Sequence, residues 1–145
     1  MSSTTAAIAW PKVGEKLPPV AFGPFLQEDL RAYAAASGDD NPIHLDPDLA
    51  LSIGLDAPPV HGMLVMSCFK PALAAWRHDL RIARLAGKFV QPLPCGDRVE
   101  ISGRVVQSRD GSSPQAVMRL MAHGGRGALV ILAEATLVPL EERCV

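Results

Sequence analysis

Apolar and polar residues alternate along much of the second half of the chain. The alternation is regular over residues 99–105, where small or apolar side chains at odd positions are separated by polar ones at even positions. Residues 82–90 alternate more loosely, residues 116–122 carry another apolar face, and residues 128–138 form a long apolar run. Because successive side chains of a strand point to opposite faces, this pattern predicts four strands.

Turn sequences separate these strands. Arg109-Asp110-Gly111 and the glycine-rich residues 124–127 each interrupt two apolar segments in the way typical of β-hairpins. Near the N-terminus, residues 13–19 indicate a turn that leads into a first strand or edge. Two prolines keep it away from the centre of a sheet, because proline cannot donate a hydrogen bond to a neighbouring strand. We therefore expect an antiparallel sheet.

Helical spacing replaces the alternation in two segments. The first covers residues 27–37, has acidic residues in its first turn, and ends at Gly38. The second begins near Gly62 and ends at Trp76, and it is apolar on nearly every side, so we expect other structure to enclose it. A proline within it should kink the helix or loosen one turn. One antiparallel sheet wrapped around one long apolar helix accounts for this order of elements, which is an α+β fold.

A turn-rich segment connects the two helices. Residues 39–42 (DDNP) have turn chemistry, and Pro42 stiffens the turn by fixing its own φ and keeping Asn41 out of helical geometry. Asp46-Pro47 is typical of an N-cap followed by proline in the first helical position, and it predicts a short helix through Ser52. Side chains on this stiff turn would keep a fixed orientation.

Composition limits what these elements can build. The chain has 145 residues, of which 48% are hydrophobic and 20% charged, as expected for one globular domain spanning residues 1–145. A formal net charge of −1 without a basic cluster gives no case for nucleic-acid binding. The most apolar stretch, residues 63–76, is interrupted by a lysine and a proline and is too short to span a bilayer, so no membrane partner is expected.

Cysteine usage and the N-terminus indicate the compartment. Cys68, Cys95 and Cys144 are odd in number and widely spaced, so they match neither a disulfide framework nor a metal site. Residues 1–10 lack the basic start and the long apolar core of a secretion signal. We expect a cytoplasmic protein without a metal.

An acid/base pair and a helix N-terminus form the candidate active site. Asp39 and His44 flank the stiff turn, and Gly62 starts the apolar helix. An imidazole can take or give a proton near neutrality, a carboxylate can orient water, and a helix N-terminus offers an amide to a developing oxyanion. Alone, Asp39 is better explained as a turn residue and His44 as a structural histidine. Together they favour activation of water against a polarised carbonyl compound.

Three motifs carry a family resemblance. They are residues 37–44 (SGDDNPIH), residues 59–63 (PVHGM) and residues 89–97 (FVQPLPCGD). In combination they resemble the MaoC-like family of hot-dog-fold hydratases, which includes the (R)-specific enoyl-CoA hydratases of fatty acid metabolism. The resemblance covers about residues 12–138. It implies a hot-dog fold, an antiparallel β-sheet wrapped around a long central helix, and a hydro-lyase activity (hydratase or dehydratase).

The resemblance also implies the roles of individual residues. Asp39 and His44 would hold and activate the water that adds to an α,β-unsaturated acyl thioester, and the backbone amide of Gly62 would bind the thioester oxygen. Independently of the resemblance, we expect Asn41 to form the turn and support the site by hydrogen bonding, and His61 to fix the start of the helix by hydrogen bonding. No cofactor or metal is implied, since coenzyme A enters as part of the substrate.

The expected partners are an acyl-CoA or acyl-carrier thioester and a second copy of the chain. A single hot-dog unit usually completes its sites by pairing, and pairing would cover its edge strands, so we expect a homodimer or a larger even assembly. Three alternatives remain open: an acyl-CoA thioesterase, a hydratase of branched dicarboxylic acyl-CoA on the same fold, and a non-catalytic acyl-thioester-binding domain. A thioesterase would need its water aimed at the carbonyl carbon instead of Cβ.

Overall fold

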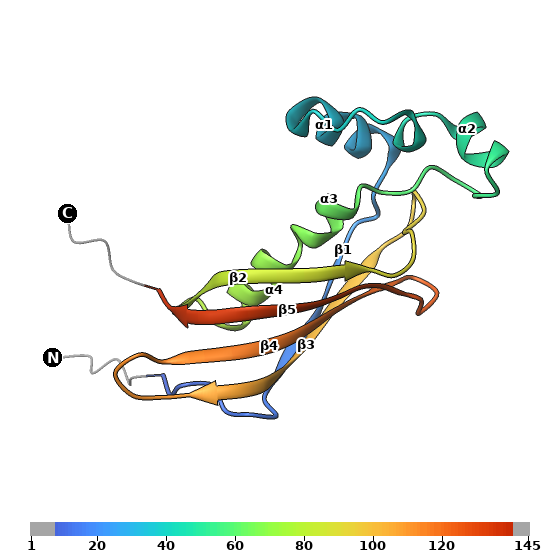
Figure 1. Ribbon diagram of the computed structural model, residues 1–145. Coiled ribbons are helices and arrows are strands. Elements are labelled where there is room, and N and C mark those ends of the chain that lie inside the picture. Colours follow the sequence, from blue (N-terminus) through green and yellow to red (C-terminus); the bar gives the residue numbers. More distant parts are fainter. Residues whose placement is uncertain (1–7, 141–145) are drawn as a thin grey trace, which may run out of the picture.

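The computed structural model describes residues 8–140 and contains one five-stranded sheet with helices packed along and beyond one end of it (Figure 1). The strands are β1 (Lys16–Phe22), β2 (Leu80–Phe89), β3 (Val99–Arg109), β4 (Gln115–Gly124) and β5 (Leu129–Pro139). The helices are α1 (Gln27–Ser37), the 3₁₀ helix η1 (Pro42–His44), α2 (Pro47–Ser52), α3 (Gly62–Met66) and α4 (Phe69–Trp76). Cys144 and most of the N-terminal segment considered as a secretion signal lie outside the described residues.

The sheet has the strand order β1-β3-β4-β5-β2, and every neighbouring pair is antiparallel. The four strands predicted from alternation are confirmed, as are the two hairpins that join β3 to β4 and β4 to β5. β1 lies at one edge, and its pairing with β3 shifts register between Leu17 and Val20, where the two prolines fall. The prediction that these prolines confine β1 to an edge is therefore confirmed.

The helices α1 and α2 have the caps that their sequences predict. Gly38 adopts a left-handed conformation with φ of 80°, and its amide donates to the Ala34 carbonyl at 3.0 Å, which closes α1. The Asp46 side chain accepts hydrogen bonds from the amides of Asp48 and Leu49 and thereby caps α2. These caps fix the two ends of the turn-rich segment between the helices.

The central helix is interrupted. α3 ends at Met66 and α4 begins at Phe69, with Ser67 and Cys68 between them. Pro71 explains the position of the break, because its ring clashes with the carbonyl of the residue four positions earlier, which is Ser67, and it has no N–H to bond that carbonyl. The predicted loosening of one turn is confirmed. The expectation of one continuous helix is corrected to two successive short helices.

Only one side of α3 and α4 packs on the sheet. Val65 and Phe69 are fully buried there against sheet residues such as Leu120, all at 0% exposure. Met63, by contrast, is 57% exposed, and Lys70 is also exposed. The expectation that other structure encloses this segment on every side is wrong within a single copy of the chain. One sheet covers only one face of a helix.

The cysteines in the described part of the chain are free. Burial raises the pKa of the Cys68 thiol to about 11, so this residue behaves as a small apolar core residue, as predicted. Cys95 is half-buried, and its thiol donates weakly to the Phe25 carbonyl at 3.5 Å. Between residues 8 and 140, no helix combines the length and the hydropathy that crossing a bilayer requires.

The core predicts a stability difference between two helix positions. Phe69→Ala removes a fully buried ring and should lower the free energy of unfolding by about 3–5 kcal/mol, because the site cannot collapse around the cavity. Leu51→Ala, at a helix position that is 60% exposed, is the matched control and should change it by less than about 0.5 kcal/mol. Urea denaturation measures both values. Equal effects at the two positions would contradict the placement of the core.

Candidate active site

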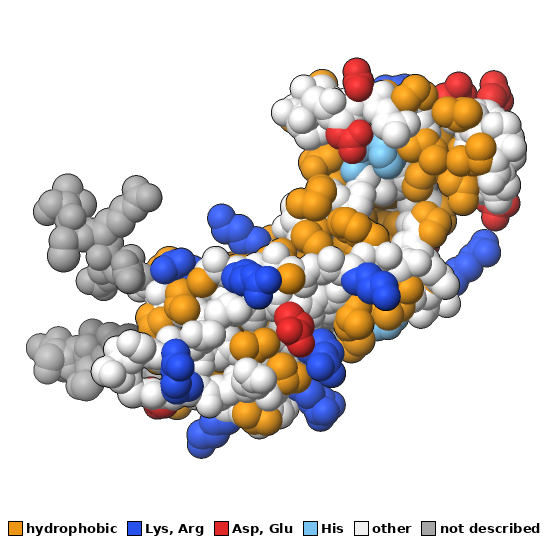
Figure 2. All heavy atoms as spheres, in the orientation of Figure 1, with side chains coloured by type: hydrophobic (Ala, Val, Ile, Leu, Met, Phe, Trp, Pro, Cys, Tyr) orange, Lys and Arg blue, Asp and Glu red, His pale blue; other side chains and the backbone are white. Residues whose placement is uncertain are grey.

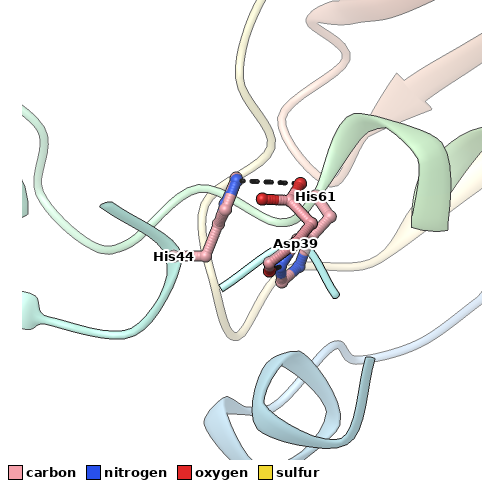
Figure 3. Close-up of side chains that lie close together, drawn as sticks. All are labelled: Asp39, His44 and His61. Atoms are coloured by element: carbon pink, nitrogen blue, oxygen red, sulfur yellow. Dashed lines mark hydrogen bonds and ion pairs between the residues drawn. The ribbon is translucent and has the colours of Figure 1, made fainter. Parts of the chain in front are cut away.

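The candidate site lies where the segment after α1 meets the start of α3 (Figure 3). Gly38 turns the chain at the end of α1 and places Asp39 immediately after the helix. The Asp39 amide donates to the Ser37 hydroxyl at 3.1 Å, and its Oδ1 lies 3.5 Å from the Asn41 amide nitrogen. Its side chain is 52% exposed, and Oδ2 faces His44. Asp39 is thus a turn residue whose carboxylate is open to solvent.

Asn41 and Pro42 build the stiff turn that the sequence predicts. The Asn41 side-chain oxygen accepts a hydrogen bond from the Ile43 amide at 3.1 Å, and Pro42 follows as the first residue of η1. The 3₁₀ helix ends at His44, whose side chain is 14% exposed. The contacts of Asn41 are those of a turn-former, and a role for it toward a substrate stays a prediction.

The hydrogen bond at Nδ1 of His44 determines which nitrogen is available for chemistry. Nδ1 lies 2.7 Å from the Pro59 carbonyl oxygen, which can only accept, so Nδ1 carries the proton. In the neutral ring Nε2 is then bare, and it lies 3.9 Å from Oδ2 of Asp39. Two atoms at this separation can each hydrogen-bond the same water molecule at about 2.8 Å. A proton acceptor and a carboxylate therefore face one small volume.

His61 is buried directly behind this pair. Its ring is 1% exposed, stacks on the ring of His44 with centroids 3.9 Å apart, and lies 4.7 Å from the ring of Tyr33. Nε2 of His61 donates to the main-chain carbonyl of Asp39 at 3.0 Å. Burial is the main cause that lowers the pKa of His61, and the neighbouring His44 adds to this, whereas the Asp39 carbonyl opposes it. His61 thus ties a buried ring to the backbone of Asp39.

A cavity of about 490 Å³ opens at Asp39, whereas His44 is not among the residues that line it. Its lining includes Asp39, Gly62, Met63, Phe89, Gln91 and Val130. Figure 2 shows hydrophobic side chains gathered below the histidines, at the hollow between the helices and the sheet. Gly62 begins α3, where first-turn amides have no intrahelical acceptor, and no side chain caps this helix. An apolar chain with a polar head group fits such a cavity.

The same three side chains are also the group of possible metal ligands in residues 8–140, because donor atoms of Asp39, His44 and His61 lie within 4.8 Å of one another. Two of the four imidazole nitrogens already donate to carbonyls, however, and Nδ1 of His61 is sealed from solvent. The donors available to a cation are the open carboxylate and one imidazole nitrogen. The expectation that the reaction needs no metal stays a prediction.

Several residues at the site had no role in the sequence prediction. The Pro59 carbonyl sets the tautomer of His44, and the ring of Phe89 lies against Gly62, so close that a Cβ on that glycine would lie 2.6 Å from a ring atom. Tyr33 packs on His61. The motif of residues 89–97 marked the segment that contains Phe89, but no spacing could show that it reaches the start of α3.

Comparisons with known proteins identify the family of the chain. The family model described as "MaoC like domain" matches residues 9–123. An (R)-specific enoyl-CoA hydratase of Aeromonas caviae is 32% identical over an alignment of 119 residues, and the match covers 75% of this chain and 82% of that protein. A mitochondrial 3-hydroxyacyl-[acyl-carrier-protein] dehydratase of Arabidopsis thaliana is 35% identical over 97 residues. That match covers 67% of this chain and 57% of the Arabidopsis protein, so the chain spans little more than half of that relative.

Solved structures show the same fold. The structure of the (R)-hydratase from A. caviae involved in PHA biosynthesis superimposes with a TM-score of 0.80 at 30% identity, covering 90% of this chain and 98% of that one. An unliganded R-hydratase from Pseudomonas aeruginosa gives a TM-score of 0.75 at 25% identity, covering 91% of this chain and 84% of that one. With a family model matching 115 of its residues and these neighbours in structure, the chain belongs to the MaoC-like domain family and has its hot-dog fold.

Proposed function

We propose that this protein is a hydro-lyase that adds water reversibly to a 2-enoyl thioester, as an (R)-specific enoyl-CoA hydratase or 3-hydroxyacyl-thioester dehydratase. The observation that carries the proposal is the bare Nε2 of His44, 3.9 Å from the Asp39 carboxylate at the border of a largely apolar cavity. The hydratase and dehydratase names of the relatives support it. The acyl thioester occupies the cavity, and one domain supplies the acid/base pair.

In the forward direction His44 and Asp39 activate one water molecule. Nε2 of His44 takes a proton from the water as the water oxygen bonds to Cβ, and the electron pair of the double bond moves toward the thioester carbonyl. The Asp39 carboxylate orients the water and stabilises the imidazolium. The imidazolium then returns a proton to Cα, so the elements of one water are added. Dehydration uses the same groups in reverse.

Negative charge develops on the thioester oxygen during this step, and we propose that the Gly62 amide donates a hydrogen bond to that oxygen. Gly62 lines the cavity on which Asp39 also borders, and its N–H belongs to the first turn of α3, which has no side-chain cap. Coenzyme A takes part only as the carrier portion of the substrate. Neither a separate cofactor nor a metal enters the proposed reaction.

A second copy of the chain is proposed to complete the assembly, in a homodimer or a larger even oligomer. β2 lies at a sheet edge and pairs, among the described strands, with β5 alone. At its end Phe89 and Val90 are 52% and 44% exposed, and Met63 on α3 is 57% exposed. An open edge beside exposed apolar groups favours pairing with another copy. We also propose a cytoplasmic location, which the free thiols of Cys68 and Cys95 support.

Single substitutions of the acid/base pair should abolish most of the turnover. Asp39→Asn and His44→Ala are each expected to lower kcat by about 10²–10⁴, the range that general acid–base catalysis supplies. Loss of the conjugated enoyl-thioester absorbance, followed over a panel of enoyl-CoA substrates, measures the rate. Circular dichroism of each variant checks that it is folded.

Asp40→Asn is the matched control for Asp39→Asn, since it removes the same charge from the adjacent exposed residue, and it should leave kcat within about twofold. Wild-type protein that turns over no enoyl thioester would remove the proposed function. Release of free coenzyme A thiol in the same assay, without loss of enoyl substrate by hydration, would identify a thioesterase instead. Equal rates for wild type and His44→Ala would contradict the site.

The assembly proposal predicts the mass in solution. Light scattering coupled to size exclusion should give an even multiple of the mass of one chain, with two copies as the smallest species, because the β2 edge is expected to be covered. A monomer that persists at all protein concentrations and retains full activity would contradict the proposed pairing.

A further inference from the structure

His61 is a buried titratable group at the site that the proposed mechanism does not use. Its ring is in contact with three groups from three different elements: Tyr33 of α1, Asp39 of the turn, and His44 at the end of η1. Tyr33 packs against it at an interplanar angle of 60°, whereas His44 is nearly parallel to it at 23°. His61 therefore stands between the main chain of one proposed catalytic residue and the ring of the other.

The hydrogen-bond inventory of His61 allows a single proton. Nε2 donates to the Asp39 carbonyl, and Nδ1 is buried with no hydrogen-bond partner in the described part of the chain. An imidazolium would carry a second N–H at Nδ1, without an acceptor and without water to solvate it. The neutral ring with its proton on Nε2 is the form that this environment accommodates.

The proton state of His61 affects His44, because the two imidazole rings are stacked. A charge on His61 would lie against the ring of His44, with ring centroids only 3.9 Å apart, and would oppose the proton that His44 must take up. A neutral ring presents a π face to the imidazolium of His44 instead. Through the hydrogen bond from Nε2, His61 also holds the backbone from which the Asp39 side chain projects.

We propose that His61 is a neutral positioning residue that holds the backbone of Asp39 in place opposite His44 and adds no positive charge beside the His44 ring. This inference deepens the proposed function and rests on it. In the proposed reaction His61 touches neither the water nor the acyl chain. It acts through the Asp39 carbonyl and the face of the His44 ring.

Two substitutions separate the hydrogen bond from the ring. His61→Phe keeps an aromatic ring of similar size but removes the donor, and kcat should fall by about 10–100-fold, because catalytic groups displaced by ~1 Å lose rate on this scale. KM should stay within about twofold, because His61 makes no substrate contact. His61→Gln returns an amide N–H near the position of Nε2 and should recover about tenfold of the lost kcat. His78→Gln, at an exposed turn histidine, is the control and should match wild type.

His61→Phe with wild-type kcat would overturn the proposal, as would His61→Gln no more active than His61→Phe. A loss of kcat accounted for by loss of folded protein in circular dichroism would also overturn it, since His61 would then be only structural.

Nitrogen-15 NMR of the wild type gives a readout that needs no turnover. The His61 ring should remain in the neutral Nε2–H form at pH 6.5, where an unperturbed imidazole is about half protonated. An inactive wild type with neutral His61 would remove the proposed function but not the assigned proton state. An active wild type with protonated His61 would remove this inference alone.

Discussion

The hydrogen bond from Nδ1 of His44 to the Pro59 carbonyl is the contact on which the site depends. It joins the turn after α1 to the segment that leads into α3, two parts of the chain that are 15 residues apart. It also leaves Nε2 without a proton on the side of the ring that faces Asp39. One contact thus sets both the position and the proton state of the proposed base.

The rest of the fold serves to hold the two ends of this contact. Gly38 closes α1 and places Asp39 directly after it. Asn41 and Pro42 begin η1, and His44 is its last residue. The sheet supports α3 through the apolar core. The strain of this arrangement is small, since the only left-handed residue among these is a glycine. In Figure 1, α1 and α2 lie beyond one end of the sheet, whereas α3 and α4 run along it and contribute Val65 and Phe69 to the apolar core.

Local chemistry explains which features the sequence could predict. Alternation, hairpin glycines, the edge prolines and the caps of α1 and α2 act over a few residues, so the pattern of residues determined them. The break between α3 and α4 was foreseeable as a loosened turn at Pro71, but its extent depends on packing. Exposure of Met63 was not foreseeable, because a hydrophobic pattern shows what must be covered and not whether one chain covers it.

The candidate site divides in the same way. Asp39, His44 and Gly62 could be named from motifs, and the structure brings all three to one end of the fold. The stacking of His61 on His44 and the contact of Phe89 with Gly62 join segments far apart in sequence, so no local pattern carries them. They depend on how the turn, α3 and the end of β2 come together in space.

A crystal structure of the protein with an unreactive saturated acyl-CoA would show whether the pair and the Gly62 amide meet the substrate as proposed. We expect a water held by both Asp39 and His44 about 3–3.5 Å from Cβ of the acyl chain, with the thioester oxygen about 2.7–3.1 Å from the Gly62 amide nitrogen. An acyl chain bound away from this cavity, or a thioester oxygen turned away from the start of α3, would contradict it.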